Sequence, residues 1–186
     1  MPSPLFKGVY RVDSTRLSRW NYSSPGYYYV TICTKNRRSL FGVVKNNKMK
    51  LSALGQICND CWIDLPNHYR NCALDECIVM PNHVHGIILI RYDVAPKNLK
   101  PCSPNVETGL KPVSTTNIKR YSLSEIIRGF KTFSAKKMNI LNGTPGTKRW
   151  QSRFYDRIIR NEKELYNVRK YIRNNPIKWK EDSYFL

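Results

Sequence analysis

Two stretches with strand character, residues 72–80 and 82–91, flank the dipeptide Met80-Pro81 and constrain the fold more than any other feature of the sequence. Both are rich in β-branched and aliphatic residues, which favour strands. Proline has no backbone N–H to donate, so a bulge, a bend or a sheet edge is expected between them. The segment "MPNHVHGIILI" also places two histidines one residue apart, directly before an aliphatic run.

The first third of the chain predicts a strand, a hairpin and a helix. "GYYYVTICT" at 26–34 is β-branched and aromatic, as strands are. Residues 43–50 predict a small hairpin that turns at Asn46–Asn47, because Asn tolerates positive φ. Ser52 can cap a helix over 52–65 that ends before the following proline.

The last third predicts two capped helices with a strand between them. Ser122 with Glu125 fits a capping box, and Gly143 ends that helix. A strand is expected near 155–159. Asn161 and Glu164 then form a second box, with Asn in place of Ser or Thr, and Pro176 closes the last helix. The first helix is thus predicted to run from Ser122, capped with Glu125, to Gly143, and the strand to cover 155–159. The last helix is predicted to run from Asn161, capped with Glu164, to Pro176.

The order of elements predicts one α+β domain. Strands and helices alternate loosely, with room for antiparallel pairing, so a single sheet with helices packed on it fits best. We expect a basic N-terminal arm over 1–25, one domain over 26–180 and a short tail over 181–186. Within the domain, the proline-rich and aperiodic residues 93–121 predict a mobile loop.

The charge predicts a polyanionic partner. The chain carries 32 Lys and Arg against 13 Asp and Glu, a net charge of +19. Such a surface attracts nucleic acid first and an anionic membrane second, and a plain cationic housekeeping domain is the third alternative. No apolar run reaches the roughly 18–20 residues of a membrane span, and the start lacks a signal-peptide core. We therefore expect a cytoplasmic protein, at the nucleoid where DNA is bound.

The cysteines have two interpretations. Cys58 and Cys61 form a C-x-x-C with Cys72 and Cys77 downstream, a spacing compatible with zinc. However, Cys58 and Cys61 share one face of the predicted 52–65 helix, where cysteine packs as a small hydrophobe. Free thiols are the favoured interpretation for a reducing cytosol.

His83 and His85 are candidate metal ligands. Side chains alternate along a strand, so both imidazoles project from one face while Val84 points toward the core. Their Cα atoms lie about 7 Å apart, which lets both rings share one cation. The alternatives are two polar residues on a solvated face, or two core histidines with satisfied protons.

Tyr171 and Asn175 are candidate partners of the histidines. They lie one turn apart on the last helix, so they share a face. An amide oxygen suits a hard cation such as Mg²⁺ or Mn²⁺, and a phenol beside a metal-polarised phosphate can act as a nucleophile. The alternative is that Tyr171 packs and Asn175 caps the helix. Tyr155 and Tyr166 fit the nucleophile's place less well.

Five stretches carry a family resemblance: "YSSPGYYYVTICTKNRRSLFG", "VMPNHVHGIILI", "SLSEIIRGFKTFSAKKMN", "RWQSRFYDRIIRNEKEL" and "YIRNNPIKW". Together, in this order, the chain resembles the REP-associated tyrosine transposases of the single-tyrosine HUH superfamily (IS200-like). The resemblance implies a ferredoxin-like sandwich, a mainly antiparallel sheet with helices on it and the HUH motif on a central strand. It also implies that His83 and His85 hold a divalent metal and that Tyr171 attacks the scissile phosphate. Asn175 stands where the family often has Gln as third ligand.

The resemblance further implies an enzyme that cleaves and rejoins hairpin-containing (REP-like) single-stranded DNA through a 5′-phosphotyrosine. The alternatives are a domesticated, inactive DNA- or RNA-binding protein, a ribosome-associated protein and a rolling-circle initiator. The protein is expected to be a monomer or a homodimer. Candidate DNA contacts are the basic residues Arg16, Arg19, Arg37, Arg38, Arg128, Lys131, Lys136, Lys137, Arg149 and Arg153.

Overall fold

The structure, a computed structural model, describes residues 17, 20–92 and 119–185. The candidate contacts Arg16 and Arg19, most of the expected N-terminal arm and residues 93–118 of the expected loop lie outside the described residues.

A four-stranded sheet forms the centre of the fold. Its strand order is β4-β5-β1-β6, and every neighbouring pair is antiparallel. The order is that of two interlocked β-α-β units, so the predicted ferredoxin-like α+β architecture is confirmed. The strand bearing both histidines is β5, an interior strand as predicted. The strands are β1 (Gly26–Cys33), β4 (Cys72–Val79), β5 (His83–Ile90) and β6 (Tyr155–Ile159).

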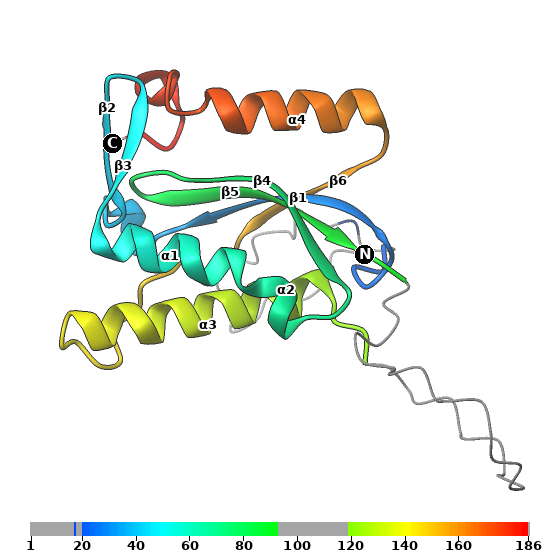
Figure 1. The fold of residues 1–186 in the computed structure, drawn as a ribbon, viewed down its shortest axis with the longest axis horizontal. Coiled ribbons are helices and arrows are strands. Elements are labelled where there is room, and N and C mark those ends of the chain that lie inside the picture. Colours follow the sequence, from blue (N-terminus) through cyan, green and yellow to red (C-terminus); the bar gives the residue numbers. More distant parts are fainter. Residues whose placement is uncertain (1–16, 18–19, 93–118, 186) are drawn as a thin grey trace, which may run out of the picture.

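Helices cover the two faces of the sheet unequally. Three helices lie on one face and α4 lies alone on the other (Figure 1). A separate hairpin, β2 with β3, stands beside the sheet, and short 3₁₀ turns follow β1 and α4. The helices are α1 (Ala53–Ile63), α2 (Leu65–His68), α3 (Leu123–Leu141) and α4 (Glu162–Asn174); the hairpin strands are β2 (Gly42–Lys45) and β3 (Lys48–Leu51), and the turns are η2 (Lys35–Arg37) and η3 (Trp179–Glu181).

The helix caps follow the sequence prediction. The Ser52 side chain accepts a hydrogen bond from Gly55 N, and Ser122 forms a full capping box with Glu125. Asn161 caps α4 by accepting from Glu164 N. These contacts satisfy backbone N–H groups that a helix leaves unpaired at its first turn.

The hairpin turn is also as predicted. Asn46 and Asn47 both have positive φ, 52° and 57°, which is the backbone of a type I′ turn. The dipeptide Met80-Pro81 lies where the chain reverses between β4 and β5. Of the alternatives expected there, the structure has a bend.

Alternation along β5 separates two apolar clusters. Val84 and Ile88 face α1 and α3, where they join a large buried cluster that includes Trp62 and Phe130. Ile87 faces α4 and joins a smaller cluster with Leu165 and Ile172. His83 and His85 have the parity of Ile87, so they lie on the α4 face, and Val84 points to the core as predicted.

Gly86 lies between His85 and Ile87, at a point where β5 carries no side chain. A Cβ atom built at Gly86 would lie 2.3 Å from the Trp62 ring. The indole of α1 therefore packs directly against the backbone of the histidine-bearing strand. Trp62 is fully buried, and its Nε1 has no hydrogen-bond partner.

A β-bulge interrupts β4. Leu74 pairs with Ile88 and Cys77 pairs with Gly86, so Asp75 and Glu76 together oppose one residue of β5. Consecutive residues normally point to opposite faces, but a bulge can turn two neighbours to the same side. This irregularity sets up the contacts of α4 described below.

The five described cysteines are free thiols, as expected. Cys58 and Cys61 are buried in the cluster between α1 and the sheet, and among the described residues no cysteine belongs to a cluster that could hold a metal. In the described part of the chain, none of the helices combines the length and the apolar character that crossing a membrane requires.

Candidate active site

His83 and His85 lie side by side on the α4 face of β5. Both side chains are fully buried, and their Nε2 atoms are 2.9 Å apart. The two rings are tilted by 66° with centroids 4.3 Å apart. Both imidazoles therefore project from one face of the strand, as the two-residue period predicts, with one nitrogen of each ring close together.

Neighbouring side chains fix the protonation of His83. Asn82 Nδ2 donates to the carbonyl of Tyr184 at 2.7 Å, which turns Asn82 Oδ1 toward His83 Nδ1 at 2.8 Å. An amide oxygen can only accept, so His83 Nδ1 carries the proton and its Nε2 keeps a lone pair. A second contact of this kind commonly sets the tautomer of a metal-binding histidine.

His85 has adjustable partners instead. Its Nδ1 lies 2.7 Å from Tyr29 Oη and 2.9 Å from Thr31 Oγ1. Hydroxyl groups can donate or accept, so they can support either tautomer of His85. Both hydroxyls come from β1, where Thr31 pairs directly with His85. Thus β1 supports the ring that β5 presents.

Burial keeps both imidazoles neutral. Desolvation lowers the pKa of His83 below its usual value, although the nearby Asp182 carboxylate partly opposes this. Desolvation lowers the pKa of His85 further, and the neighbouring His83 acts in the same direction. Neutral imidazole is the form that binds metal ions.

Tyr171 reaches this pair from α4. Its Oη lies 3.4 Å from His85 Nε2, and its ring contacts the His85 ring with centroids 5.2 Å apart. The residue is 44% exposed, so its hydroxyl lies between the buried histidines and the solvent. Burial raises the pKa of Tyr171 to about 12, helped by Asp182 and Tyr184, while hydrogen bonds with Tyr29 and Asn175 lower it.

The other two tyrosines lie in different positions. Tyr166 is 63% exposed on α4 and has no contact with the histidines among those found in the described residues. Tyr155 lies on β6, paired with Thr31, and its ring meets the edge of Tyr29 at 6.3 Å. Of the three candidates, Tyr171 is the one whose hydroxyl approaches His85.

Asp182 joins the histidines, and the sequence prediction missed it. One nitrogen of each imidazole and one carboxylate oxygen of Asp182 lie within 4.8 Å of one another. Two nitrogens and a carboxylate form a donor set suited to a divalent cation. Asp182 comes from the segment after η3, and the sequence there carries no pattern that points back to β5.

Asn175 lies at the end of α4, beside Asp182. Its Nδ2 donates to Asp182 Oδ2 at 2.9 Å, and its Oδ1 is buried without a hydrogen-bond partner. Buried carbonyl oxygens are nearly always paired, so an orphaned one beside a cluster of ligand atoms fits a cation site. The predicted ligand Asn175 and the unpredicted Asp182 therefore belong to one group.

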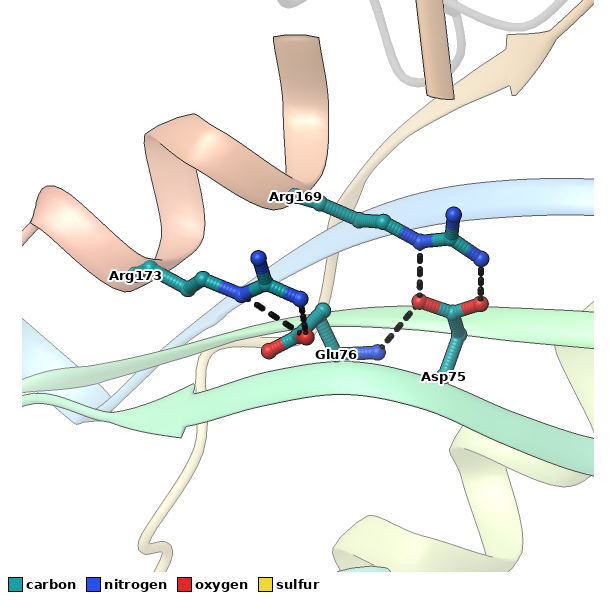
Figure 2. A network of polar contacts seen from close by, with 4 residues as sticks. All are labelled: Asp75, Glu76, Arg169 and Arg173. Carbon is teal, nitrogen blue, oxygen red and sulfur yellow. Dashed lines mark hydrogen bonds and ion pairs between the residues drawn. The ribbon is translucent and has the colours of Figure 1, made fainter. Parts of the chain in front are cut away.

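Ion pairs fasten α4 to β4. Arg169 Nε and Nη2 donate to Asp75 Oδ1 and Oδ2 at 2.8 and 2.5 Å, and Arg173 donates to Glu76 Oε1 through Nε at 2.9 Å and through Nη2 (Figure 2). We call these four residues the α4 clamp. The bulge in β4 makes the α4 clamp possible, because it turns two neighbouring acids toward the helix.

The α4 clamp sets the rotation of the helix that carries Tyr171. At about 100° per residue, Arg169 and Arg173 lie on one flank of α4 and Tyr171 on the other. On the Tyr171 side, Glu164 pairs with Arg157 of β6 and accepts from Arg160 N at 2.8 Å. The helix is thus tied to both edge strands of the sheet, with Tyr171 held over β5.

Several predicted DNA contacts have structural partners. Lys131 Nζ donates to the carbonyls of Gln151 and Arg153, both at 2.9 Å. Arg149 is 7% exposed and donates to Asn139 Oδ1 and Thr144 Oγ1, which holds the loop after α3. The exposed members of the predicted set are Arg37, Arg38, Arg128, Lys136, Lys137 and Arg153.

The fold was compared with those of solved structures. The structure of a REP-associated tyrosine transposase bound to a REP hairpin superposes with a TM-score of 0.56 at 20% identity, over 89% of this chain and 74% of that one. The two proteins share a fold. A candidate transposase from Deinococcus radiodurans R1 gives a TM-score of 0.45 at 14% identity, over 89% of this chain and 97% of that one.

The sequence also resembles that of a curated protein. An uncharacterized protein of Haemophilus influenzae (strain ATCC 51907 / DSM 11121 / KW20 / Rd) is 35% identical over 183 residues, 96% of either chain. The chain belongs to the same family as that protein. No model of a known protein family matches the sequence.

Proposed function

We propose that this HUH-fold protein is a metal-dependent tyrosine transposase that cleaves and rejoins single-stranded, hairpin-bearing DNA. One observation carries the proposal: Tyr171 Oη lies 3.4 Å from His85 Nε2, and His83 Nε2 lies 2.9 Å beyond it. A nucleophile and a paired-imidazole site meet at one point although the chain separates them widely. The net charge of +19 supports a DNA partner.

The cation site is formed by His83, His85 and Asp182, with Asn175 beside them. Each of the two histidines offers a neutral nitrogen, Asp182 offers a carboxylate oxygen, and Asn175 holds Asp182 through its amide. Oxygen donors favour Mg²⁺ or Mn²⁺. When bound, such a cation would withdraw charge from the scissile phosphate and lower the pKa of nearby hydroxyls.

Tyr171 is the nucleophile. Its Oη gives up its proton to solvent and attacks the scissile phosphorus, the P–O3′ bond breaks, and the 3′ oxygen takes up a proton from solvent and leaves as a hydroxyl. The product is a 5′-phosphotyrosine on Tyr171. One phosphodiester replaces another, so the DNA 3′-hydroxyl can reverse the reaction and rejoin strands without an energy source.

The α4 clamp contributes by orientation. A reacting group gains most when it is already held in an attacking position, because the ordering entropy has been spent on folding. Arg169 and Arg173 fix one flank of α4 on β4, which leaves Tyr171 directed at His85 from the other flank. We place the reaction in the cytoplasm, at the DNA itself.

The proposal is tested with end-labelled hairpin-bearing single-stranded DNA and Mn²⁺, followed by denaturing gels. We expect a covalent protein–DNA species that is absent for Tyr171→Phe and strongly reduced for His83→Ala. Tyr166→Phe is the matched control, because Tyr166 is an exposed tyrosine of the same helix and should leave the adduct unchanged.

Other outcomes would change the assignment. An adduct that persists in Tyr171→Phe would move the nucleophile to another tyrosine. DNA binding without any adduct, across many hairpins, would support the domesticated binding protein instead. Asp182→Asn is informative about the metal, since loss of Mn²⁺ binding in that variant but not in Asn175→Asp would make Asp182 the third ligand.

A further inference from the structure

A pocket outside the site described above lies between the C-terminal half of α3 and the segment 143–152. Its volume is about 720 Å³, within the range of about 300–1,000 Å³ that ligand sites occupy. Its apolar lining comes from Ala135, Ile140, Pro145 and Trp150. The pocket does not contain any of the proposed catalytic or metal-binding residues.

The charged residues that line this pocket are all basic. Its basic residues are Lys131, Lys136, Lys148 and Arg149, and its lining includes no Asp or Glu. Lys131 and Arg149 shape the walls through the hydrogen bonds given above. Lys136 and Lys148 are exposed, and in the described part of the chain neither has a carboxylate within ion-pair distance.

One edge of the pocket adjoins the strands beside the proposed active site, although the pocket opens on the α3 face of the sheet and the histidines lie on the α4 face. Gln151, part of its lining, donates from its backbone N to the carbonyl of Cys33 at 3.0 Å, and Cys33 pairs with His83 on β5. Adjacent strands lie about 4.8 Å apart, so the Gln151 backbone is about two strand spacings from that of His83. A DNA strand held at Tyr171 would therefore pass around the end of the sheet to reach the pocket.

We propose that this pocket binds an unpaired nucleotide of the single-stranded flank of the DNA substrate, with the base on the apolar lining and phosphates at Lys136 and Lys148. Proteins hold single strands by pairing cations with phosphates and by contacting bases with apolar, usually aromatic, side chains. Here the exposed Lys136 and Lys148 supply the cations, and the aliphatic Ile140 and Pro145 supply the apolar contact. The proposal rests on the proposed function, because it assigns a subsite to that substrate.

Two neighbouring pairs of residues on α3 provide the test. Lys136 and Ile140 line the pocket, whereas Lys137 and Leu141, the next residue in each case, do not. Lys137 instead lies toward Cys61 of α1, where burial raises the pKa of that thiol and the charge of Lys137 partly opposes this. Ile140 and Leu141 are both exposed, at 71% and 54%, so a charged side chain at either position leaves the core intact.

The variants are Lys136→Ala against Lys137→Ala, and Ile140→Glu against Leu141→Glu, all made in Tyr171→Phe protein so that cleavage cannot occur. The probe is a fluorescein-labelled DNA hairpin with a single-stranded flank, and the readout is anisotropy over a salt series. We expect Lys136→Ala to weaken binding several-fold and to reduce the slope of log K against log salt by about 0.7, the contribution of one phosphate on a single strand.

Ile140→Glu should weaken binding more than Leu141→Glu, although both change the charge equally. Both differences should disappear with a hairpin that lacks the flank. Equal effects within each pair, or a difference that persists without the flank or that appears only with an RNA probe, would overturn the proposal. Because no step needs Tyr171, the subsite can fail while adduct formation succeeds, or the reverse.

Discussion

The two faces of the sheet are held by different forces. On the α3 face, nineteen buried residues of the described chain form one apolar cluster, with Phe130 and Trp62 in edge-to-face contact at 5.2 Å. On the α4 face the buried cluster has five members, and only Leu165 and Ile172 of α4 are among them. There, α4 also forms ion pairs through Asp75, Glu76 and Arg157.

The two faces of the sheet therefore contribute differently: one mainly stabilises the domain, and the other orients the candidate site residues. Apolar burial is non-directional, so the α3 face stabilises the domain without fixing any single atom accurately. Bidentate arginine–carboxylate pairs have a defined geometry, which suits a helix whose tyrosine must reach a given point. The face that carries His83, His85 and Tyr171 is therefore the less apolar and the more precisely oriented one.

The largest expected effect is on the α3 face. Phe130→Ala removes a ring that contacts both Trp62 and Trp150, and we expect a loss of about 3–5 kcal/mol in the free energy of unfolding. Urea denaturation measures it as a lower midpoint at constant slope. A loss below about 1 kcal/mol would contradict the view that apolar burial stabilises the α3 face.

Asp75→Asn is expected to lower the free energy of unfolding less than Phe130→Ala does, but to reduce adduct formation more. The variant keeps the shape of Asp75 and removes the charge that Arg169 binds, which costs about 1 kcal/mol because Arg169 remains partly in contact with water. We expect amide exchange to quicken in α4 and not in α3, and adduct formation to fall several-fold.

Two further variants sharpen this test. Asp60→Asn removes an acid from the exposed side of α1 and should leave α4 exchange unchanged. Arg169→Lys keeps the charge but cannot form the two-pronged contact, so its effect should fall between wild type and Asp75→Asn. If α3 and α4 exchanged equally faster in Asp75→Asn, the α4 clamp would be part of the global stability alone.

The smallest expected effect is a change in the free energy of unfolding at acidic pH. The hydrogen bonds from Arg169 hold the pKa of Asp75 below its usual 3.8. A carboxyl with a lowered folded-state pKa stabilises the fold above its unfolded pKa and loses that contribution as pH falls through the folded value. Unfolding free energies of wild type and Asp75→Asn should therefore differ at neutral pH and converge below about pH 4. A constant difference would contradict the assigned pKa shift.

The sequence predicted best what local rules decide. Helix starts at Ser52, Ser122 and Asn161 follow from side chains that bond to backbone groups three residues away, and such contacts need no tertiary information. The shared face of His83 and His85 follows equally from the two-residue period of a strand. The ferredoxin-like order came from the resemblance, since local patterns do not specify which strands pair.

The sequence did not predict features that depend on residues far away in the chain. Asp182 reaches the histidines from the segment after η3, and nothing near it in the chain predicts that approach. The bulge at Asp75 and Glu76 replaces the simple alternation on which strand prediction depends. Arg149 was predicted as a phosphate contact because it is basic, and the sequence did not indicate that its Nε and Nη2 also donate to Asn139 and Thr144.

At Gly86 the histidine-bearing strand has no side chain, so only its backbone separates the α3 face of the sheet from the α4 face. The Trp62 indole rests against the peptide that follows His85, so any enlargement at position 86 has to displace either that ring or the strand itself. Repacking beneath the sheet is consequently transmitted through a single thickness of backbone to the ligand atoms above it. Attempts to thermostabilise this protein by refilling its interior should be expected to shift His83 and His85 at the same time.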